Sequence, residues 1–380
     1  MWCFLFLLPF LQLSADLSAL YLSWYGDPTS TMTIQWHSLP EEIGDTISLK
    51  SLDDGWHSVD GEHIEMDGIL VHKVSLTNLD PGMEYSFRIG TDSKIYRFRT
   101  APDQLNEPLR FVIGGDIYGS TKIFRRMCKT VVENDPLFAV LGGDIAYAIN
   151  IHPFRSSALR RWVAFLRDWK DHMITPSGRI IPFLIVPGNH DIAPDNYELF
   201  FSLFAFPQKQ LYRAVDFGSY LSLILLDTAH FQPIEGRQTL WLDKALSART
   251  SIPYRFAVYH EAAYPSFKPY HGTIPKKIRT HWVPLFENYN LSAAFENHNH
   301  TYKKTYPIKD NQIDPDGIIY IGDGAWGVPS RKTNDLWYLA KRSRKNNVLL
   351  ISLTEQEATI QAIDMLNAPF DTTIITPPNN

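Results

Sequence analysis

The sequence predicts two domains, a small antiparallel β-sandwich followed by a larger α/β domain. A chain of 380 residues has room for about two domains of ordinary size, and its 44% hydrophobic and 13% aromatic residues are enough for packed cores. Up to Thr100 the pattern consists of short alternating runs separated by turns, which is typical of antiparallel strands. After Leu109 short apolar runs alternate with stretches of helical period, which indicates an α/β domain.

The first predicted domain is an antiparallel sandwich over residues 16–100. Its runs, such as TMTIQWHS, DTISLKSL and ILVHKVSL, are rich in β-branched and aromatic residues and are bounded by Asp-Pro, Asp-Gly and Pro-Gly. We expect no cluster of metal-type or nucleophilic residues in it, and we place its histidines on the surface: His37, His57, His63 and His72. Residues 101–108 contain two prolines and no apolar period, which predicts a linker.

The second predicted domain covers residues 109–367. Its helices are expected at 120–133, 156–171, 195–204, 236–248 and 274–289, where apolar residues recur at helical spacing. Residues 368–380 are predicted to be a tail, because their end, TPPNN, is rich in proline and should fray.

The first fifteen residues, MWCFLFLLPFLQLSA, have the length of a signal-peptide core and end in small residues. No Lys or Arg precedes the apolar run, so a hydrophobic first strand is the alternative. Removal of residues 1–15 would leave Cys128 without an intramolecular disulfide partner, since Cys3 is the other of the two cysteines. The expected location is secreted or periplasmic.

The charge and the apolar runs argue against a nucleic-acid partner and against a membrane-spanning segment. The net charge is -5, and no Lys/Arg-rich block is long enough to form a nucleic-acid footprint. No apolar run reaches the roughly 18 to 20 residues that a membrane-spanning helix needs. We therefore expect neither nucleic-acid binding nor a membrane span, and nothing in the sequence indicates an oligomeric state.

Five apolar runs of the second domain end in polar side chains that bind metals. The polar residues are Asp116 after RFVIGG, Asp144 after LFAVLGG, Asn189 and His190 after PFLIVPG, His260 after RFAVY, and His298 and His300 after SAAFEN. Ligands of α/β sheets bind beyond the carboxyl ends of the strands, so these side chains should converge. Carboxylate, amide and imidazole ligands suit iron, manganese or zinc.

Seven side chains of this kind are too many for one ion and suit two ions that share a carboxylate. Two neighbouring metal ions can clamp a phosphoryl group and supply a hydroxide nucleophile. The glycines that precede Asp116, Asp144 and Asn189 are expected to let each strand turn sharply next to the ions, because glycine has no Cβ.

The second domain contains, in this order, the motifs GGDIYG, GGDIAY, GNHD, VYHEAAY and NHNH. They resemble the five motifs of the purple acid phosphatases, which are calcineurin-like metallophosphoesterases. The phrases LDPGMEYSFRIG and FRTAP are similar to the end of that family's fibronectin type III-like N-terminal domain. The resemblance extends over nearly all of residues 16–380. It implies a four-layer αββα arrangement for residues 109–367.

The same resemblance implies roles for the metal-type residues. Asp116, Tyr147 and His300 would hold the first ion, Asn189, His260 and His298 the second, and Asp144 would bridge the two. The phenolate of Tyr147 favours Fe(III) at the first site and a purple colour, and the second ion would be Fe(II), Zn or Mn. Tyr118 stands where most relatives outside this family have a ligand histidine.

Other residues near the motifs receive weaker assignments. His190 and His271 are predicted to contact the phosphate or protonate the leaving group, and Asp191 is predicted to orient ligands from a second shell. The family's last motif usually begins with Gly, so Asn297 is expected to carry any positive φ there. Lys303 and Lys304 are expected to be a solvated pair.

The predicted function is hydrolysis of phosphate monoesters by attack of a metal-held hydroxide, as in purple acid phosphatases. One alternative is a phosphodiesterase that acts on nucleotides or phospholipid head groups with the same two-metal centre. A second alternative, from another class, is a surface binding protein whose sandwich is the working part and whose phosphatase domain is degenerate.

Overall fold

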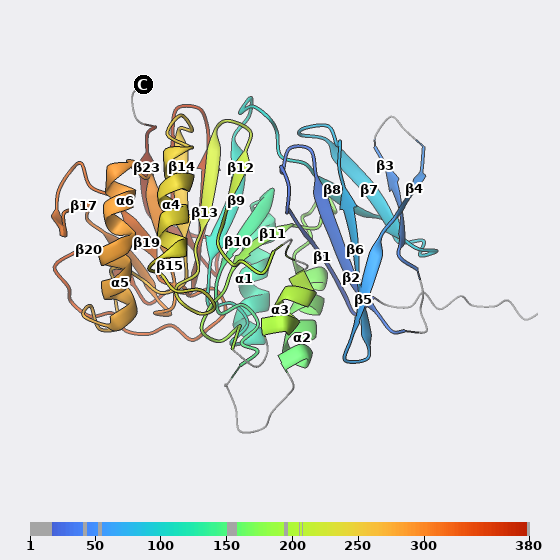
Figure 1. The fold of residues 1–380 in the computed structure, drawn as a ribbon, viewed down its shortest axis with the longest axis horizontal. Helices are drawn as coiled ribbons and strands as arrows, with labels where there is room; N and C mark the ends of the chain where they lie inside the picture. The colour runs from blue at the N-terminus through green and yellow to red at the C-terminus, as the bar shows by residue number, and fades with distance from the viewer. Residues whose placement is uncertain are drawn as a thin grey trace, which may run out of the picture.

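The computed structural model describes residues 17–40, 44–51, 55–149, 158–193, 197–204, 206 and 208–377. The predicted signal peptide, residues 1–15, lies outside the described residues. The chain forms two domains that pack side by side (Figure 1), with the N-terminal strands at one end and the mixed α/β domain at the other.

The N-terminal domain is a sandwich of two four-stranded antiparallel sheets, as predicted. One sheet has the order β1-β2-β6-β5, with bounds Ala19–Ser23, Met32–Ser38, Ile69–Leu76 and Glu62–Met66. The other has the order β4-β3-β7-β8, with bounds His57–Asp60, Thr46–Lys50, Glu84–Ile89 and Tyr96–Arg99. Along β7, Tyr85, Phe87 and Ile89 are buried and alternate with less buried residues, because successive side chains of a strand face opposite sides.

The expectation that the sandwich histidines lie on the surface is wrong for two of the four. His37 and His72 are fully buried, whereas His57 and His63 are exposed. His37 is buried because the outer face of its sheet packs against the second domain. Its neighbour Gln35 donates a hydrogen bond from Nε2 to the carbonyl of Leu203 at 2.9 Å.

The second domain contains two large sheets. The six-stranded sheet has the order β11-β10-β9-β21-β22-β23, with bounds Phe183–Val186, Phe138–Gly142, Leu109–Gly114, Asn347–Leu353, Ala358–Asp364 and Pro369–Ile375. The seven-stranded sheet has the order β12-β13-β14-β15-β19-β16-β20, with bounds Arg213–Phe217, Leu221–Leu225, Tyr254–Val258, Ala293–Glu296, Tyr320–Gly322, Tyr302–Thr305 and Leu339–Ser343. A short hairpin joins β17 (Ile308–Lys309) and β18 (Gln312–Ile313).

Strand β23 lies within residues 368–380, which the sequence pattern placed in a tail. It pairs with β22 in antiparallel fashion and forms the edge of the six-stranded sheet. The pattern did not reveal it because six of its seven residues are exposed or only partly buried, as is usual for an edge strand.

The helices lie near the predicted positions. They are α1 (Thr121–Glu133), α2 (Ala158–His172), α3 (Tyr197–Phe204), α4 (Arg237–Ser247), α5 (Thr273–His281) and α6 (Val283–Asn288). The single helix expected over 274–289 is two helices, which meet at the fully buried Trp282. The reason is Pro284 in the first turn of α6, which has no backbone N–H to continue the hydrogen bonds of α5. None of the helices within the described residues is long and apolar enough to cross a membrane.

The two large sheets pack face to face between two helical layers. Phe111 and Val140 of one sheet share a core with Phe256 and Phe295 of the other. The outer face of the six-stranded sheet packs on α1, α2 and α3, and the outer face of the seven-stranded sheet packs on α4, α5 and α6. This is the four-layer αββα arrangement that the resemblance implied.

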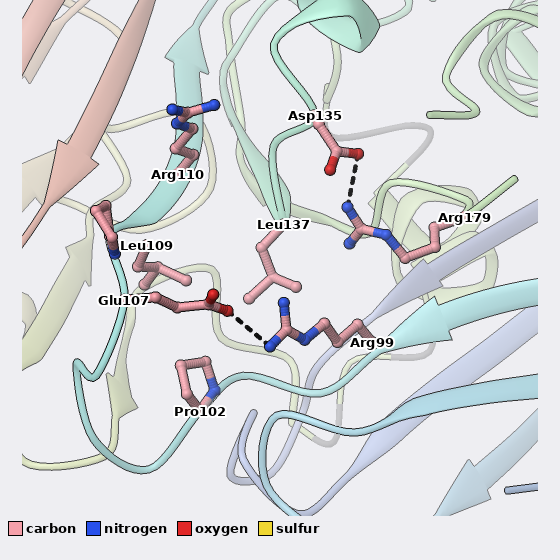
Figure 2. Close-up of a pocket in the computed structure, with 9 residues that line it drawn as sticks. Arg99, Pro102, Glu107, Leu109, Arg110, Asp135, Leu137 and Arg179 are labelled. Atoms are coloured by element: carbon pink, nitrogen blue, oxygen red, sulfur yellow. Dashed lines mark hydrogen bonds and ion pairs between the residues drawn. The ribbon is translucent and has the colours of Figure 1, made fainter. Parts of the chain in front are cut away.

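The two domains share one apolar core. Trp24 of the sandwich lies edge-on against Phe138 and Phe217, at ring-centroid distances of 5.7 and 5.8 Å. Their junction also contains a pocket of about 290 Å³ (Figure 2). Two of its arginines are paired with carboxylates, Arg99 with Glu107 at 2.8 Å and Arg179 with Asp135 at 2.7 Å. These pairs compensate the arginine charges, and the pocket contains none of the predicted site residues.

Candidate metal centre

The predicted metal ligands follow five strands that belong to both large sheets. In the six-stranded sheet, β9 is followed by Asp116, β10 by Asp144 and Tyr147, and β11 by Asn189. In the seven-stranded sheet, β14 is followed by His260, and β15 by His298 and His300. Strands β9, β10 and β11 are parallel to one another, and so are β14 and β15. The side chains therefore meet beyond the carboxyl ends of these strands, where the two sheets face each other.

One group of side chains gathers around Asp116. Its Oδ1 atom lies 3.0 Å from Nε2 of His300 and 3.3 Å from the hydroxyl of Tyr147. The hydroxyl of Tyr147 also lies 3.3 Å from Nε2 of His300. Asp116, Asp144 and His300 each offer one ligand atom, and the three atoms lie within 4.8 Å of one another.

A second group gathers around His260. Its Nε2 atom lies 3.1 Å from Oδ1 of Asn189 and 3.1 Å from Nδ1 of His298. The opposite ring nitrogen, Nδ1, lies 2.9 Å from the carbonyl oxygen of Gly142. An N–H at Nδ1 donates to this carbonyl, so a metal ion that displaced the proton on Nε2 would find its lone pair directed into the site, which is the usual arrangement for a ligand histidine.

Asp144 belongs to both groups, since its carboxylate oxygens lie within reach of His260 with His298 and of Asp116 with His300. Its Oδ1 accepts a hydrogen bond from the backbone N–H of His190 at 2.8 Å. Its Oδ2 is buried and has no hydrogen-bond partner among the described residues. A buried carboxylate oxygen without a partner is costly, and a cation between the two groups would satisfy it.

The electrostatics of the site favour bound cations. Burial alone would raise the pKa of Asp144, but the imidazole of His260 outweighs burial and holds this pKa below its usual range. Burial, followed by the neighbouring His260, lowers the pKa of His298 to about 2, so this imidazole is neutral and keeps a lone pair for a ligand bond. Burial and then the carboxylates of Asp116 and Asp144 raise the pKa of Tyr147. A phenolate at Tyr147 therefore requires a cation beside it.

The backbone is unusual at five of the candidate ligands, which adopt positive φ although none is glycine. The angles are 57° at Asp116, 49° at Asp144, 53° at Tyr147, 79° at His298 and 59° at His300. Each such residue costs about 1 to 3 kcal/mol and persists where the surrounding structure imposes it, most often at functional sites.

Glycines allow the strand ends to approach the site, as predicted. A Cβ atom at Gly143, where φ is +88°, would lie 2.5 Å from Nδ1 of His260. A Cβ atom at Gly188 would lie 2.1 Å from the backbone nitrogen of Asp144. Larger residues at either position would displace a candidate ligand.

Asn297 does not carry the positive φ that was expected of it. The left-handed residues of this motif are His298 and His300. The amide of Asn297 instead points back between the strands, where Nδ2 donates to the carbonyl of Tyr259 at 2.9 Å. It packs so closely against Gly142 that a Cβ there would lie 2.1 Å from Nδ2. Asn297 therefore ties β14 and β15 to the six-stranded sheet.

His190 and Asp191 lie next to the ligands. The ring of His190 is stacked on that of Tyr147, with centroids 5.2 Å apart, and it remains partly accessible to solvent. Asp191 is fully buried and accepts hydrogen bonds from the backbone N–H groups of Ile145, Ala146 and Gly188. Asp191 thus holds together the two loops that present Asp144 and Asn189.

His271 and Tyr118 contact residues other than the candidate ligands. The exposed His271 packs edge-on against Tyr270, and the structure gives no contact between His271 and a candidate ligand within the described residues. The hydroxyl of Tyr118 donates to Asp168 at 2.9 Å. Tyr147, whose hydroxyl faces Asp116, is therefore the better placed of the two tyrosines.

Sequence analysis missed His230, whose ring lies edge-on to that of His260 with centroids 5.6 Å apart. The buried carboxylate of Asp227 accepts hydrogen bonds from the backbone N–H groups of residues 230, 231 and 232 and so fixes the loop. The signal that could have indicated this loop is the position of Asp227 two residues after the end of β13, because His260 stands two residues after the end of the parallel neighbour β14.

The expectation that Lys303 and Lys304 form a solvated pair is wrong for Lys303. Its side chain is fully buried and forms an ion pair with Glu296, which is also fully buried. Glu296 further accepts hydrogen bonds from the hydroxyl of Tyr259 and the backbone N–H of Ala263, both at 2.7 Å. This network supports the loop that follows His260.

Comparisons with known proteins agree with this fold. Purple acid phosphatase 13 of Arabidopsis thaliana is 25% identical over 309 residues, which cover 70% of this chain and 55% of that protein. Purple acid phosphatase 15 of the same plant is 24% identical over 369 residues, which cover 83% of this chain and 67% of that protein. The aligned parts thus span about half to two thirds of these relatives.

A solved structure shows the same fold. Purple acid phosphatase from yellow lupin (Lupinus luteus) seeds superposes with a TM-score of 0.77 at 14% identity, covering 94% of this chain and 74% of that one. Residues 17–100 match the family described as purple acid phosphatase, N-terminal domain, and residues 109–302 match the calcineurin-like phosphoesterases. The chain therefore belongs to the calcineurin-like phosphoesterase family and carries the N-terminal domain of the purple acid phosphatases.

Proposed function

We propose that this protein is an acid phosphatase that hydrolyses phosphate monoesters with the help of two metal ions. The observation that carries the proposal is the position of Asp144 in both ligand groups, with a buried Oδ2 that lacks a partner among the described residues. Its plant relatives are named purple acid phosphatases, which is consistent with this activity.

The donor set suits two ions. Asp116, Tyr147 and His300 would hold one ion, Asn189, His260 and His298 would hold the other, and Asp144 would bridge them. The distances of 3.0 to 3.4 Å between neighbouring donor atoms support this division, because donors that share one ion are about this far apart. The mixture of carboxylate, amide, imidazole and phenol favours iron, zinc or manganese over calcium.

Bound metal ions would polarise the phosphate ester and stabilise the charge that develops on it. The chain's own residues would then position the substrate and move protons. His190 is the best placed proton donor, because its ring is partly accessible and its backbone N–H is bonded to Asp144. We assign it to the protonation of the leaving alkoxide, with His271 as a second candidate and Asp191 as the residue that holds the loops in place.

Tyr147 supports Fe(III) as the ion of the first group. A phenolate is a hard, strongly donating ligand, and burial beside two carboxylates keeps this tyrosine protonated unless a cation of high charge lies next to it. Fe(II), Zn or Mn would occupy the second group.

The proposal is tested by metal analysis and by assay of the full chain with para-nitrophenyl phosphate. We expect hydrolysis, iron bound to the protein, and loss of both when chelators strip the metals. Bis-nitrophenyl phosphate separates the phosphodiesterase alternative, since a diesterase would prefer it to the monoester. If the chain bound no metal, the result would instead support the alternative of a surface binding protein whose phosphatase domain is degenerate.

We also propose that the protein is secreted or periplasmic, with residues 1–15 as its signal peptide. N-terminal sequencing of the mature protein tests this, because a cleaved signal would give a chain that begins near residue 16.

A further inference from the structure

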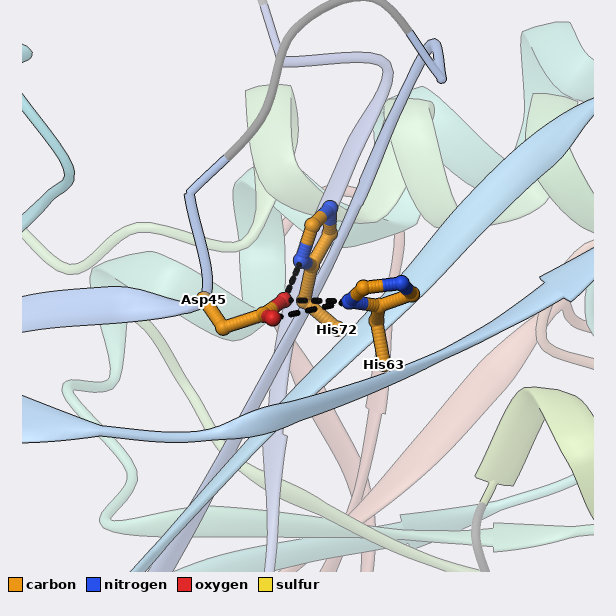
Figure 3. A group of neighbouring side chains, drawn as sticks. All are labelled: Asp45, His63 and His72. Atoms are coloured by element: carbon orange, nitrogen blue, oxygen red, sulfur yellow. Dashed lines mark hydrogen bonds and ion pairs between the residues drawn. The ribbon is translucent and has the colours of Figure 1, made fainter.

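A second cluster of metal-type side chains lies in the N-terminal sandwich, where the sequence predicted none. It consists of Asp45, His63 and His72, whose ligand atoms lie within 4.8 Å of one another (Figure 3). Nδ1 of His72 lies 2.6 Å from Oδ1 of Asp45, and Nδ1 of His63 lies 2.8 Å from Oδ2 of the same carboxylate. Both imidazoles thus direct the same ring nitrogen toward one carboxylate.

The three residues come from both sheets of the sandwich. His63 on β5 and His72 on β6 are direct partners in the antiparallel register of one sheet. Asp45 directly precedes β3, which belongs to the other sheet. A ligand shared by the three side chains would therefore connect the two sheets.

His72 is held rigidly. It is fully buried, and its ring lies flat on that of Trp36, with centroids 4.7 Å apart and planes 2° from parallel. Its Nε2 atom lies 2.7 Å from Oγ of Ser38, whose hydroxyl can donate to the carbonyl of Leu39 at 3.2 Å. Without a metal ion, Nδ1–H of His72 donates to Asp45, and Nε2 accepts from the hydroxyl of Ser38. If an ion displaced the proton on Nδ1, Nε2–H could instead donate to Ser38. A hydrogen-bonded outer nitrogen of this kind is typical of metal-ligating histidines.

The backbone of Asp45 is held as well. Its carbonyl accepts a hydrogen bond from the N–H of Gly61 at 2.9 Å. A Cβ atom at residue 61 would lie 2.8 Å from this carbonyl oxygen, so glycine permits the approach. The carboxylate is ionised at neutral pH: burial alone raises the pKa of Asp45, but hydrogen bonds from His63 and His72 outweigh burial and lower it.

We propose that Asp45, His63 and His72 bind one zinc-type divalent ion, with water as a further ligand, and that this ion clips the two sheets together. Two imidazoles and one carboxylate are a common ligand set of zinc. Tetrahedral zinc with bonds of about 2.0 to 2.1 Å separates its ligand atoms by roughly 3.3 Å, so the groups must spread by about half an ångström and release the protons between them. The side chains of His63 and Asp45 are 38% and 28% exposed and can make this movement.

A metal clip would replace the disulfide that many small sandwiches use. The cysteine within the described residues, Cys128, is buried in α1 of the other domain. An ion that binds the folded sandwich but not the unfolded chain stabilises it by mass action.

The test is the zinc content of the full chain after equilibrium dialysis against zinc chloride. We expect the wild type to hold one more zinc per chain than His63→Ala and Asp45→Asn, whatever the occupancy of the other centre. His57→Ala is the matched control, because His57 is an exposed histidine on the neighbouring strand β4 and should leave the zinc content unchanged. His63 and Asp45 are chosen because His72→Ala removes a buried stacked ring and could unfold the domain.

A second readout is the melting temperature with and without zinc. Zinc should raise it more in the wild type and in His57→Ala than in His63→Ala, while phosphatase activity stays the same in all three. Equal zinc contents in the wild type, His63→Ala and Asp45→Asn would overturn the proposal. This outcome would leave the proposed phosphatase function untouched, since that rests on the loss of activity in variants of the other centre.

Discussion

Nε2 of His260 lies 3.4 Å from Oδ1 of Asp144, and neither side chain is exposed to solvent. Burial alone lowers the pKa of His260, but the carboxylate of Asp144 outweighs burial and raises it to about 10. Without a cation in the site, a proton on His260 therefore compensates the charge of Asp144. Bound metal ions would take over this compensation, and a single substitution at Asp144 should affect both ligand groups.

We expect Asp144→Ala to remove both ions of the centre and to abolish hydrolysis. Without the shared carboxylate, two bound cations would repel each other with no negative charge between them. Asp116→Ala should mainly empty the group that contains Tyr147 and His300. Metal analysis of the purified variants measures both effects. If Asp144→Ala kept both ions of the centre at normal affinity, Asp144 would not bridge them.

His190→Ala should keep its metals and lose about 10² to 10⁴ in turnover, the usual contribution of a positioned acid. The loss should be largest for substrates with poor leaving groups, which depend most on protonation. His271→Ala in the same assay measures the second candidate acid. Turnover of His190→Ala equal to that of the wild type on an alkyl phosphate would exclude His190 from the mechanism.

Tyr147→Phe should bleach the visible absorption of the iron-loaded protein and weaken binding at the first site, while some hydrolysis persists. Tyr118→Phe is the matched control, because the hydroxyl of Tyr118 is bonded to Asp168 rather than to a candidate ligand. Its spectrum should match that of the wild type. Bleaching in Tyr118→Phe alone would reverse the two roles, and iron loading without colour in any form would argue against ferric iron.

Lys303→Met should lower the free energy of unfolding by about 3 to 5 kcal/mol, because it leaves the buried carboxylate of Glu296 without a counter-charge. Urea unfolding measures the loss. The double variant Lys303→Met with Glu296→Gln should recover part of it. Lys304→Met is the control and should cost less, since its partner Asp371 keeps a second ion pair with Lys341 at 3.1 Å. Equal losses in Lys303→Met and Lys304→Met would contradict the argument.

Local features of the sequence were sufficient to predict the fold class and the convergence of the candidate ligands that follow strands of the same sheet. A short apolar run that ends in Gly-Gly-Asp is a strand with a sharp exit wherever it packs, and parallel strands of one sheet must bring their carboxyl ends together. Asp116 and Asp144 could therefore be placed at one site from their motifs, whereas His260 joins them because the two sheets face each other. The backbone strain of the last motif could not be predicted, because a positive φ at His298 rather than Asn297 depends on how β14 and β15 meet the other sheet.

The sequence by itself determined the approximate positions of most helices, the strands that precede the candidate ligands, and the polar residues that follow those strands. Only the tertiary structure decided the burial of His37, His72 and Lys303, the break of the last predicted helix at Trp282, and the pairing of β23 at a sheet edge. It also brought Asp45, His63 and His72 together. The physical reason is that periodicity reports one face of an element at a time, whereas burial of the second face and contacts between distant segments depend on which layer packs against it.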